Sequence, residues 1–256
     1  MGVLDDEVKP VPRRTMVLFF IVDTSGSMGG EKIASLNVAV REVLPYIDDI
    51  SSTNPDAEIK VAALEFSNGC EWMCPQPMPA ADFAWVDLTA NGLTDLGAAC
   101  QELCNKLSKS EFMHEARGSF APAFILMSDG APTDSYQHGL EKLKGNPWFK
   151  SGIKTAIAIG EDADKKVLAE FTGTDEAVFT VHNKEQLKKI IRFVSVTSSQ
   201  VGSKSSSVGK DAPTTKQEEL TQTLTETIET SDDFGGIDQG TNPSDTPDEW
   251  GIGAGW

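Results

Sequence analysis

Residues 16–30 have the sequence MVLFFIVDTSGSMGG, an apolar run that ends on one carboxylate, three hydroxyls and three glycines. A nearly continuous apolar run of this kind is typical of a central strand that is buried on both faces. From Glu31 onward, apolar side chains recur at helical spacing to about Asp49, and Pro45 is expected to kink or end that helix. The first unit is therefore a strand, a glycine-rich turn and a helix, with polar oxygens gathered where the strand ends.

The alternation of strands and helices continues along the chain. Further strands are expected at 58–66, 70–74, 124–127, 153–159 and 178–181, and further helices at 96–107, 136–143, 165–171 and 184–196, with 83–95 irregular. This order predicts an α/β fold of three layers, in which a doubly wound, mostly parallel sheet carries helices on both faces. In such sheets the ligand binds beyond the carboxyl ends of the strands, near the point where the strand order reverses.

The apolar periodicity stops near residue 200 of the 256 residues. We therefore expect an N-terminal extension at 1–14, one folded domain at 15–200 and a disordered, acidic, Ser/Thr-rich tail at 201–256. The net charge is −17, of which the tail contributes −8, from three Lys against eleven Asp and Glu. An acidic surface without a basic patch argues against nucleic acid and anionic membranes as partners, and suits a metal ion or a basic protein.

Targeting signals and cysteines point to a reducing compartment. No window of about 18 apolar residues occurs and the first residues lack an apolar signal core, so a cytoplasmic location is expected. Two C-x₃-C pairs, Cys70/Cys74 and Cys100/Cys104, could bring four thiolates to one zinc ion. We favour buried, reduced cysteines, because this spacing is not that of a standard zinc knuckle.

Three polar segments are expected to meet at the carboxyl edge of the sheet. They supply two carboxylates and three neutral hydroxyls, without imidazole or thiolate, which is the donor set that a hard divalent ion such as Mg²⁺ prefers over zinc. Each segment alone is common as a helix cap or a turn, so the prediction depends on their convergence. The candidate ligands are Asp23, Ser25 and Ser27 of the first loop, Thr94 of NGLTDLGAA and Asp129 of SDGAPTD.

Two further carboxylates stand close to these segments in the sequence. Asp95 and Asp134 each precede a helical pattern. We interpret both as helix caps rather than as ligands.

The set D-x-S-x-S, G-x-T-D-L-x-x-A and S-D-G resembles the metal-ion-dependent adhesion site of von Willebrand factor type A (vWA) domains, over roughly Thr15 to Val196. The stretches FIVDTSGSM, ADFAWVDLTANGLTDLGAA and SDGAPTD are similar to the bacterial TerY-like branch, which is associated with tellurium resistance and stress operons. The resemblance implies a vWA, Rossmann-like fold in which the five residues hold Mg²⁺, or Mn²⁺ or Ca²⁺, directly or through water. It also implies that a protein partner supplies a Glu or Asp to an open position on the ion.

The function implied is a Mg²⁺-dependent protein-binding module, not an enzyme, in a bacterial stress or kinase/phosphatase-linked system. The alternative is an aspartyl-phosphate phosphatase with Asp23 as the nucleophile, although Ser25 stands where such enzymes generally carry a second Asp. A structural scaffold acting through its tail is a third class. Serine hydrolysis is disfavoured because G-x-S-x-G is absent and because His114, His138 and His182 are expected on helix surfaces or loops.

The tail offers two further hypotheses beside that of a merely solvating segment. Threonines stand among acidic residues in KQEELTQTLTETIETSDDF (216–234), and phosphorylation would add nearly two negative charges that a phosphothreonine reader can bind. TerY-like proteins are associated with a Ser/Thr kinase and a phosphatase, so we hypothesise phosphosites at Thr221, Thr223, Thr225, Thr227 and Thr230. Trp250 and Trp256 are candidate anchors, either for a groove of another protein or for this domain itself.

Overall fold

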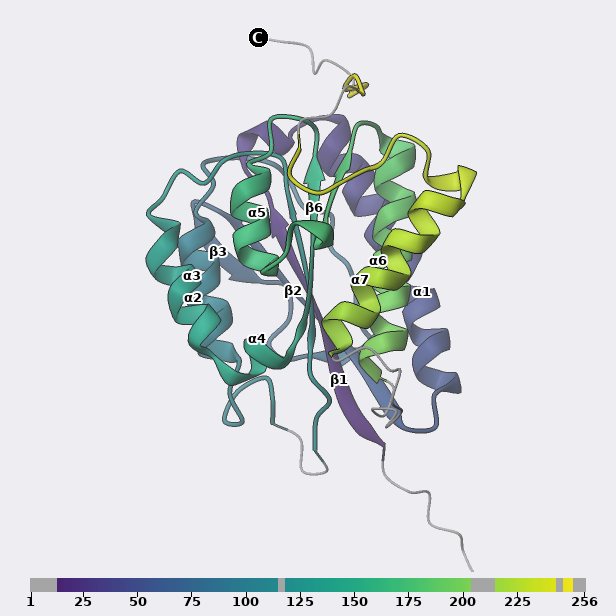
Figure 1. Cartoon of the computed structure of the whole chain (residues 1–256). Helices are drawn as coiled ribbons and strands as arrows, with labels where there is room; N and C mark the ends of the chain where they lie inside the picture. The colour runs from purple at the N-terminus through teal and green to yellow at the C-terminus, as the bar shows by residue number, and fades with distance from the viewer. Residues whose placement is uncertain (1–12, 115–117, 204–214, 243–245, 251–256) are drawn as a thin grey trace, which may run out of the picture.

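The computed structural model describes residues 13–114, 118–203, 215–242 and 246–250, and an eight-stranded sheet runs through them (Figure 1). The strand order is β3-β2-β1-β5-β6-β7-β8, with β4 paired to β2. The parallel strands are β1 (Arg14–Asp23), β2 (Ala57–Ser67), β5 (Ala123–Ser128), β6 (Ile153–Ile159) and β7 (Val178–Val181). The antiparallel strands are the short β3 (Gly69–Trp72), β4 (Met78–Pro79) and β8 (Asp238–Gln239).

Helices cover both faces of the sheet (Figure 1). One face carries α1 (Glu31–Thr53) and α6 (Lys184–Ser203), with α7 (Lys216–Thr230) packed against α6. The other face carries α2 (Leu96–Lys106), α3 (Tyr136–Gly145), α4 (Pro147–Ser151) and α5 (Lys165–Thr172). Single 3₁₀ turns are η1 (Gly26–Met28), η2 (Asp175–Ala177) and η3 (Asp232–Phe234). Among the described residues, no helix is long and apolar enough to cross a membrane.

Strand β1 lies at the centre because its side chains are apolar on both faces. All of its residues after Arg14 are buried. Phe19 stacks on Phe124 of β5 with ring centroids 5.2 Å apart, while its neighbour Phe20 meets Trp85 edge-on. Successive side chains of a strand point to opposite faces, so a strand covered by two helical layers has to be apolar throughout.

The strand order reverses at β1. The chain leaves β1 for β2 on one side and later returns to β5 on the other, so β1 pairs in parallel with both. The loops after β1 and β5 therefore diverge over the two faces of the sheet and leave a crevice between them. The α/β prediction is confirmed, and β6 and β7 begin and end at the expected residues.

Helix α6 continues to Ser203 instead of ending near residue 196, and two other helices differ from expectation. Helix α1 continues past Pro45 to Thr53, so the proline does not end it. Three apolar residues close to Pro45 are buried: Val43, Leu44 and Ile47. The packing of this apolar stripe offsets the loss of the hydrogen bond that a proline removes. Helix α4 was not expected; it is a short helix that starts on a proline and is capped by the Asn146 side chain.

The chain beyond residue 201 contains regular structure where the sequence analysis expects none. Helix α7 begins with a capping box, in which Thr215 and Glu218 bond each other's backbone amides, and it buries Leu220 and Leu224. Strand β8 then pairs with β7. Acidic residues and threonines fill most of α7, yet one apolar residue per turn is enough to dock a helix. Residues 1–12, 115–117, 204–214, 243–245 and 251–256, including Trp256, lie outside the described part of the chain.

Candidate metal centre

Three loops meet beyond the carboxyl ends of β1 and β5. The loop after β1 bonds the segment before α2 twice, through Gly26 N to Gly92 O at 3.1 Å and Asn91 N to Thr24 O at 2.7 Å. That segment bonds the loop after β5 through Thr94, whose amide donates to the Thr133 hydroxyl at 2.9 Å and whose carbonyl accepts from the Thr133 amide at 3.0 Å. The backbone thus holds the three predicted segments together.

The two carboxylates of this cluster are buried and joined through serine hydroxyls. Asp23 Oδ1 accepts the Ser25 amide at 2.8 Å, and Asp23 Oδ2 accepts the Ser128 hydroxyl at 2.5 Å. Asp129 Oδ1 accepts the Ser27 hydroxyl at 2.7 Å, and the Ser27 and Ser25 hydroxyl oxygens are 3.1 Å apart. Asp23 and Asp129 are 0% and 1% exposed, whereas Ser27 is exposed, so the cluster opens to solvent at Ser27.

The Thr94 hydroxyl completes the group from the third loop. A Cβ atom placed on Gly130 would lie 3.5 Å from Ser27 Oγ and 4.0 Å from Thr94 Oγ1, so both hydroxyls border the backbone that follows Asp129. Thr94 is itself buried. The structure therefore brings all five predicted residues together, and we call Asp23, Ser25, Ser27, Thr94 and Asp129 the oxygen cluster.

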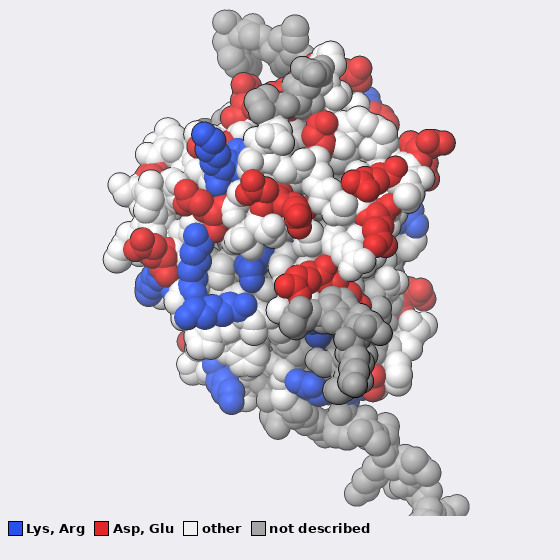
Figure 2. Space-filling model, viewed as in Figure 1, with Lys and Arg blue, Asp and Glu red and all other residues white. Residues whose placement is uncertain are grey.

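The electrostatics of the oxygen cluster favour a cation. Burial raises the pKa of Asp23 above its ordinary value, and the negative charge of Asp129 raises it further, against the hydrogen bonds from Ser128 and Ser25. Lys32 of α1 already offers positive charge, since its ammonium donates to Asp129 Oδ2 at 2.6 Å. Figure 2 shows many Asp and Glu side chains over the upper part of the molecule, where strand β6 ends in Figure 1.

A hard divalent ion fits these residues. Two carboxylates and three hydroxyls supply only oxygen donors, and a carboxylate oxygen that accepts one hydrogen bond keeps a further lone pair. Ser128 and Lys32 were missed by the sequence analysis. Ser128 stands in the S-D-G motif itself, whereas Lys32 sits among ordinary helix residues and gave no signal.

Comparison with known proteins agrees with this geometry. The family model of the von Willebrand factor type A domain matches residues 18–193, which is most of the chain. The chain belongs to the vWA family. Among curated protein sequences, none matches it.

Solved structures show the same vWA fold at low sequence identity. Proximal thread matrix protein 1 from the mussel byssus is 18% identical to this chain, with a TM-score of 0.56. Its structure is described as having a zinc-occupied metal-ion-dependent adhesion site (MIDAS) motif. The pilus adhesin SpaC from Lactobacillus rhamnosus GG is 12% identical (TM-score 0.58), and a point mutant of the PilB minor pilin from Streptococcus sanguinis is 14% identical (0.53). The alignments cover 73%, 76% and 75% of this chain but only 48%, 32% and 64% of those proteins.

The two carboxylates interpreted as caps have different roles in this vWA domain. Asp95 precedes α2, but its side chain accepts the Gly69 amide at 2.8 Å and does not cap the helix. Asp134 accepts the Ala98 amide in the first turn of α2 at 3.2 Å, so it caps the helix of another segment instead of α3. Both side chains therefore tie loops together around the oxygen cluster.

The four cysteines are free, and two of them are buried, as the favoured interpretation expects. Cys74 and Cys100 are buried, and Cys70 and Cys104 are half-buried. Burial raises the pKa of Cys70 to about 11 and that of Cys100 to about 12. Among the described residues, the cysteines do not form a group that could hold a metal ion.

The candidate phosphosites lie on α7 and differ in exposure. Thr223 and Thr230 are exposed, Thr225 and Thr227 are half-buried, and Thr221 is buried. The hydroxyls of the four beyond Thr221 each donate to the backbone carbonyl four residues earlier. Trp250 packs on this domain, where its ring lies next to Gly160.

The expectation for His182 is wrong. The sequence around it predicts a helix surface or a loop, but its side chain is 0% exposed and both ring nitrogens are hydrogen-bonded to carboxylates. The carboxylates are those of Asp238 and Asp248, which come from the segment that was expected to be disordered.

Proposed function

We propose that this vWA domain is a divalent-cation-dependent protein-binding module whose oxygen cluster holds Mg²⁺. The supporting observation is the pair of buried carboxylates, Asp23 and Asp129, linked through the Ser25 and Ser27 hydroxyls at the point where the strand order reverses. The all-oxygen donor set favours Mg²⁺ over zinc, and Mn²⁺ and Ca²⁺ share that preference. Zinc is the ion named for the mussel byssus protein, so these ions are the ones to compare.

The partner is proposed to contribute a Glu or Asp side chain. Because three of the five cluster residues are neutral hydroxyls, a bound Mg²⁺ would remain electrophilic and could take an incoming carboxylate at an open coordination position. Ser27 is exposed while Asp23 is buried, which sets the side of approach. Leu93, next to Thr94, is 57% exposed and offers an apolar contact at the rim of the cluster.

The finer proposal places the protein in the cytoplasm, in a bacterial stress or tellurium-resistance-type system linked to a Ser/Thr kinase and a phosphatase. Its support is the similarity of FIVDTSGSM and SDGAPTD to the TerY-like branch. A kinase acting on the folded chain would reach the exposed Thr223 and Thr230 before the buried Thr221. Intact-mass analysis after co-expression with the kinase tests this, and an unmodified α7 would contradict it.

The alternative is an aspartyl-phosphate phosphatase with Asp23 as the nucleophile. Both oxygens of Asp23 accept hydrogen bonds, and the residue two positions on is Ser25, which lacks the carboxylate needed as an acid/base. We therefore propose that the domain is not an enzyme. Hydrolysis of p-nitrophenyl phosphate that needs Mg²⁺ and is lost in Asp23→Asn would overturn this.

The proposed function is tested by calorimetric titration of Mg²⁺ into the wild type and Asp23→Asn. Asp82→Asn is the matched control, because Asp82 is an exposed carboxylate of another loop. We expect binding in the wild type and the control, and none in Asp23→Asn. Equal Mg²⁺ affinity in all three proteins would contradict the assignment of the oxygen cluster as the metal centre.

A further inference from the structure

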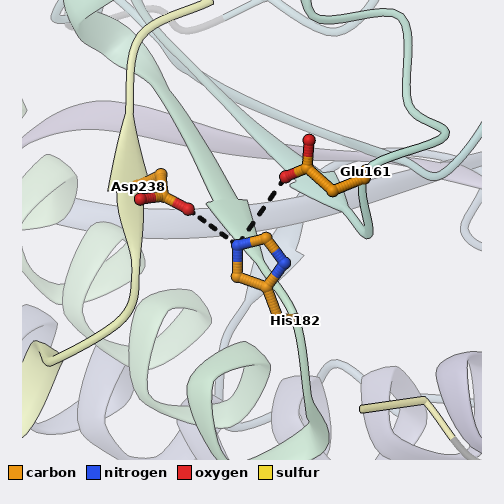
Figure 3. Close-up of side chains that lie close together, drawn as sticks. All are labelled: Glu161, His182 and Asp238. Carbon is orange, nitrogen blue, oxygen red and sulfur yellow. Dashed lines mark hydrogen bonds and ion pairs between the residues drawn. The ribbon is translucent and has the colours of Figure 1, made fainter. Parts of the chain in front are cut away.

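A second group of polar side chains lies at the same edge of the sheet, beyond β6 and β7. Glu161 follows β6, His182 follows β7, and Asp238 begins β8, which comes from the C-terminal segment. Figure 3 shows their side chains turned toward one another, and one ligand atom of each lies within 4.8 Å of the others. We call these three residues the histidine cluster.

The orientation of His182 is fixed by a fourth residue. His182 Nδ1 lies 2.8 Å from Asp248 Oδ1, and Asp248 Oδ2 accepts the Glu161 amide at 3.0 Å. An ionised carboxylate only accepts hydrogen bonds, so Nδ1 must carry the proton of this contact. His182 is fully buried and cannot exchange this partner for water.

The other ring nitrogen then faces two carboxylates. His182 Nε2 lies 2.7 Å from Asp238 Oδ2 and 3.8 Å from Glu161 Oε1 (Figure 3). Asp238 is also a carboxylate that only accepts hydrogen bonds, so its contact with Nε2 needs either a second proton on the ring or a metal ion bound at Nε2 in place of that proton. A proton on Nε2 can bond only one of the two carboxylates, whereas a divalent ion can bind the nitrogen and both carboxylates at once.

From this geometry we propose that Glu161, His182 and Asp238 form a second metal site, selective for Zn²⁺ over Mg²⁺. One imidazole and two carboxylates are ligands that zinc takes, and three protein ligands leave a fourth position open. Asp248 acts as a positioning residue, because a carboxylate that accepts the second ring N–H of a ligating histidine fixes its tautomer. The Glu161 and Asp238 side chains are about one third exposed, which gives the ion a path of entry.

Lys165 lies next to this site, where its positive charge opposes an incoming cation while its hydrogen bonds orient a ligand. Its ammonium donates to both carboxylate oxygens of Glu161, at 3.0 and 2.9 Å, and to the Asn242 carbonyl at 3.3 Å. Each carboxylate oxygen has more than one lone pair, so Glu161 can bind Lys165 and a metal ion together. Lys165 therefore holds the Glu161 side chain in place next to His182.

Zinc in the histidine cluster would join the C-terminal segment to the vWA core. Asp238 lies in β8, which pairs with β7 through Thr180↔Asp238, and the Glu249 amide donates to the His182 carbonyl at 2.7 Å. The short β8 contributes few ladder bonds of its own, so a metal bond at Asp238 would limit its opening. The site would thus hold β8 and the described residues 246–250 against the core.

The test is zinc binding in an Asp23→Asn background, which removes the oxygen cluster. After dialysis against Zn²⁺ or Mg²⁺, elemental analysis should find one zinc and no magnesium per chain. His182→Gln and Asp238→Asn should lose the zinc, whereas His138→Gln, a change of an exposed histidine on α3, should keep it. Asp248→Asn should weaken zinc binding by about 10- to 100-fold, the usual effect of removing such a partner.

Hydrogen exchange gives a second readout that needs no ligand variant. The Gly240 amide donates to the Val178 carbonyl at 2.9 Å, and we expect Zn²⁺ to slow its exchange. Absence of zinc from the Asp23→Asn protein, or zinc retained in Asp238→Asn, would overturn the proposal. Protection of the Gly240 amide that does not need zinc and that falls as the pH rises would also overturn the proposal. In that case the protonated ring of His182, together with Lys165, would be the positive charge that holds the three carboxylates of Glu161, Asp238 and Asp248.

Discussion

The oxygen cluster and the histidine cluster occupy the same edge of one sheet but are built in different ways. Three ligands of the oxygen cluster come from five consecutive residues, and its loops are tied by backbone hydrogen bonds. The ligands of the histidine cluster stand 21 and 56 residues apart (161 to 182, and 182 to 238), and one belongs to a strand of two residues. The first cluster is therefore fixed by the core, whereas the second exists only when the C-terminal segment is docked.

The two clusters also differ in the atoms that they offer to a metal ion. Five oxygen donors suit a hard ion, and the imidazole of the histidine cluster suits a softer one. A single chain can thus separate a partner-binding ion from a structural ion by ligand type. The difference between the two clusters rests on the folding of α7 and β8, on separate ions in the two clusters, and on the charges around each.

The largest effect is expected where the C-terminal segment packs. Leu224→Ala removes a fully buried side chain from α7 and should lower the free energy of unfolding by about 3 kcal/mol. Thr223→Ala, an exposed neighbour on the same helix, should change it by less than about 0.5 kcal/mol. Denaturant titration measures both, and equal small effects would show that α7 is not part of the folded domain.

Separate ions predict crossed effects on thermal stability. Mg²⁺ at about 100 times its Kd should stabilise the wild type and Asp238→Asn by about 2.7 kcal/mol and leave Asp23→Asn unchanged. Zn²⁺ should give the opposite pattern, stabilising Asp23→Asn but giving Asp238→Asn no gain from the histidine cluster. Differential scanning calorimetry measures this stabilisation. If one variant lost both the Mg²⁺ and the Zn²⁺ stabilisation, the two clusters would not bind separate ions.

Lys32 should be a competitor of the metal ion in the oxygen cluster. Lys32→Met removes the ammonium bound to Asp129, so Mg²⁺ affinity should rise about tenfold, since the ion no longer meets a like charge. Without Mg²⁺ the variant should be less stable by about 1–3 kcal/mol, because a buried carboxylate loses its partner. Lys184→Met, which breaks an exposed pair with Glu31, should change neither quantity measurably. Unchanged Mg²⁺ affinity in Lys32→Met would contradict this competition.

The smallest effect is expected from the cysteines. Burial raises the pKa of Cys70 to about 11 and of Cys100 to about 12, so at pH 8 both are thiols that react slowly. Alkylation should speed up roughly tenfold per pH unit between pH 8 and 10, because only the thiolate reacts. The number of zinc ions bound per chain should be unchanged in Cys70→Ser and Cys104→Ser. A loss of zinc in either variant would show that the cysteines are zinc ligands.

The oxygen cluster can be predicted from the sequence because its ligands stand in short motifs directly after buried strands or before a helix. Asp23, Ser25 and Ser27 end a buried strand whose apolar run is unmistakable, and parallel strands bring Asp129 to the same edge. The same logic gives most strands and helices of the core. Lys32 is not recognisable in this way, because an ion pair across 97 positions leaves no local pattern.

The histidine cluster and the C-terminal segment could not be predicted for a physical reason. Helix α7 buries Leu220 and Leu224 among threonines and acids, and its stability comes from packing on α6, not from composition. His182 follows a short strand, and its carboxylate partners are brought to it only by the pairing of β8 with β7. Such long-range pairing is invisible to a local pattern.

The most direct test of the central claim is affinity capture from the source lysate on immobilised protein. Three samples are compared: wild type with Mg²⁺, wild type with EDTA, and Asp23→Asn with Mg²⁺. We predict a partner held only in the first sample, and released when an acidic side chain of that partner is replaced. The same partners in all three samples would contradict the account, because binding would then not depend on the oxygen cluster.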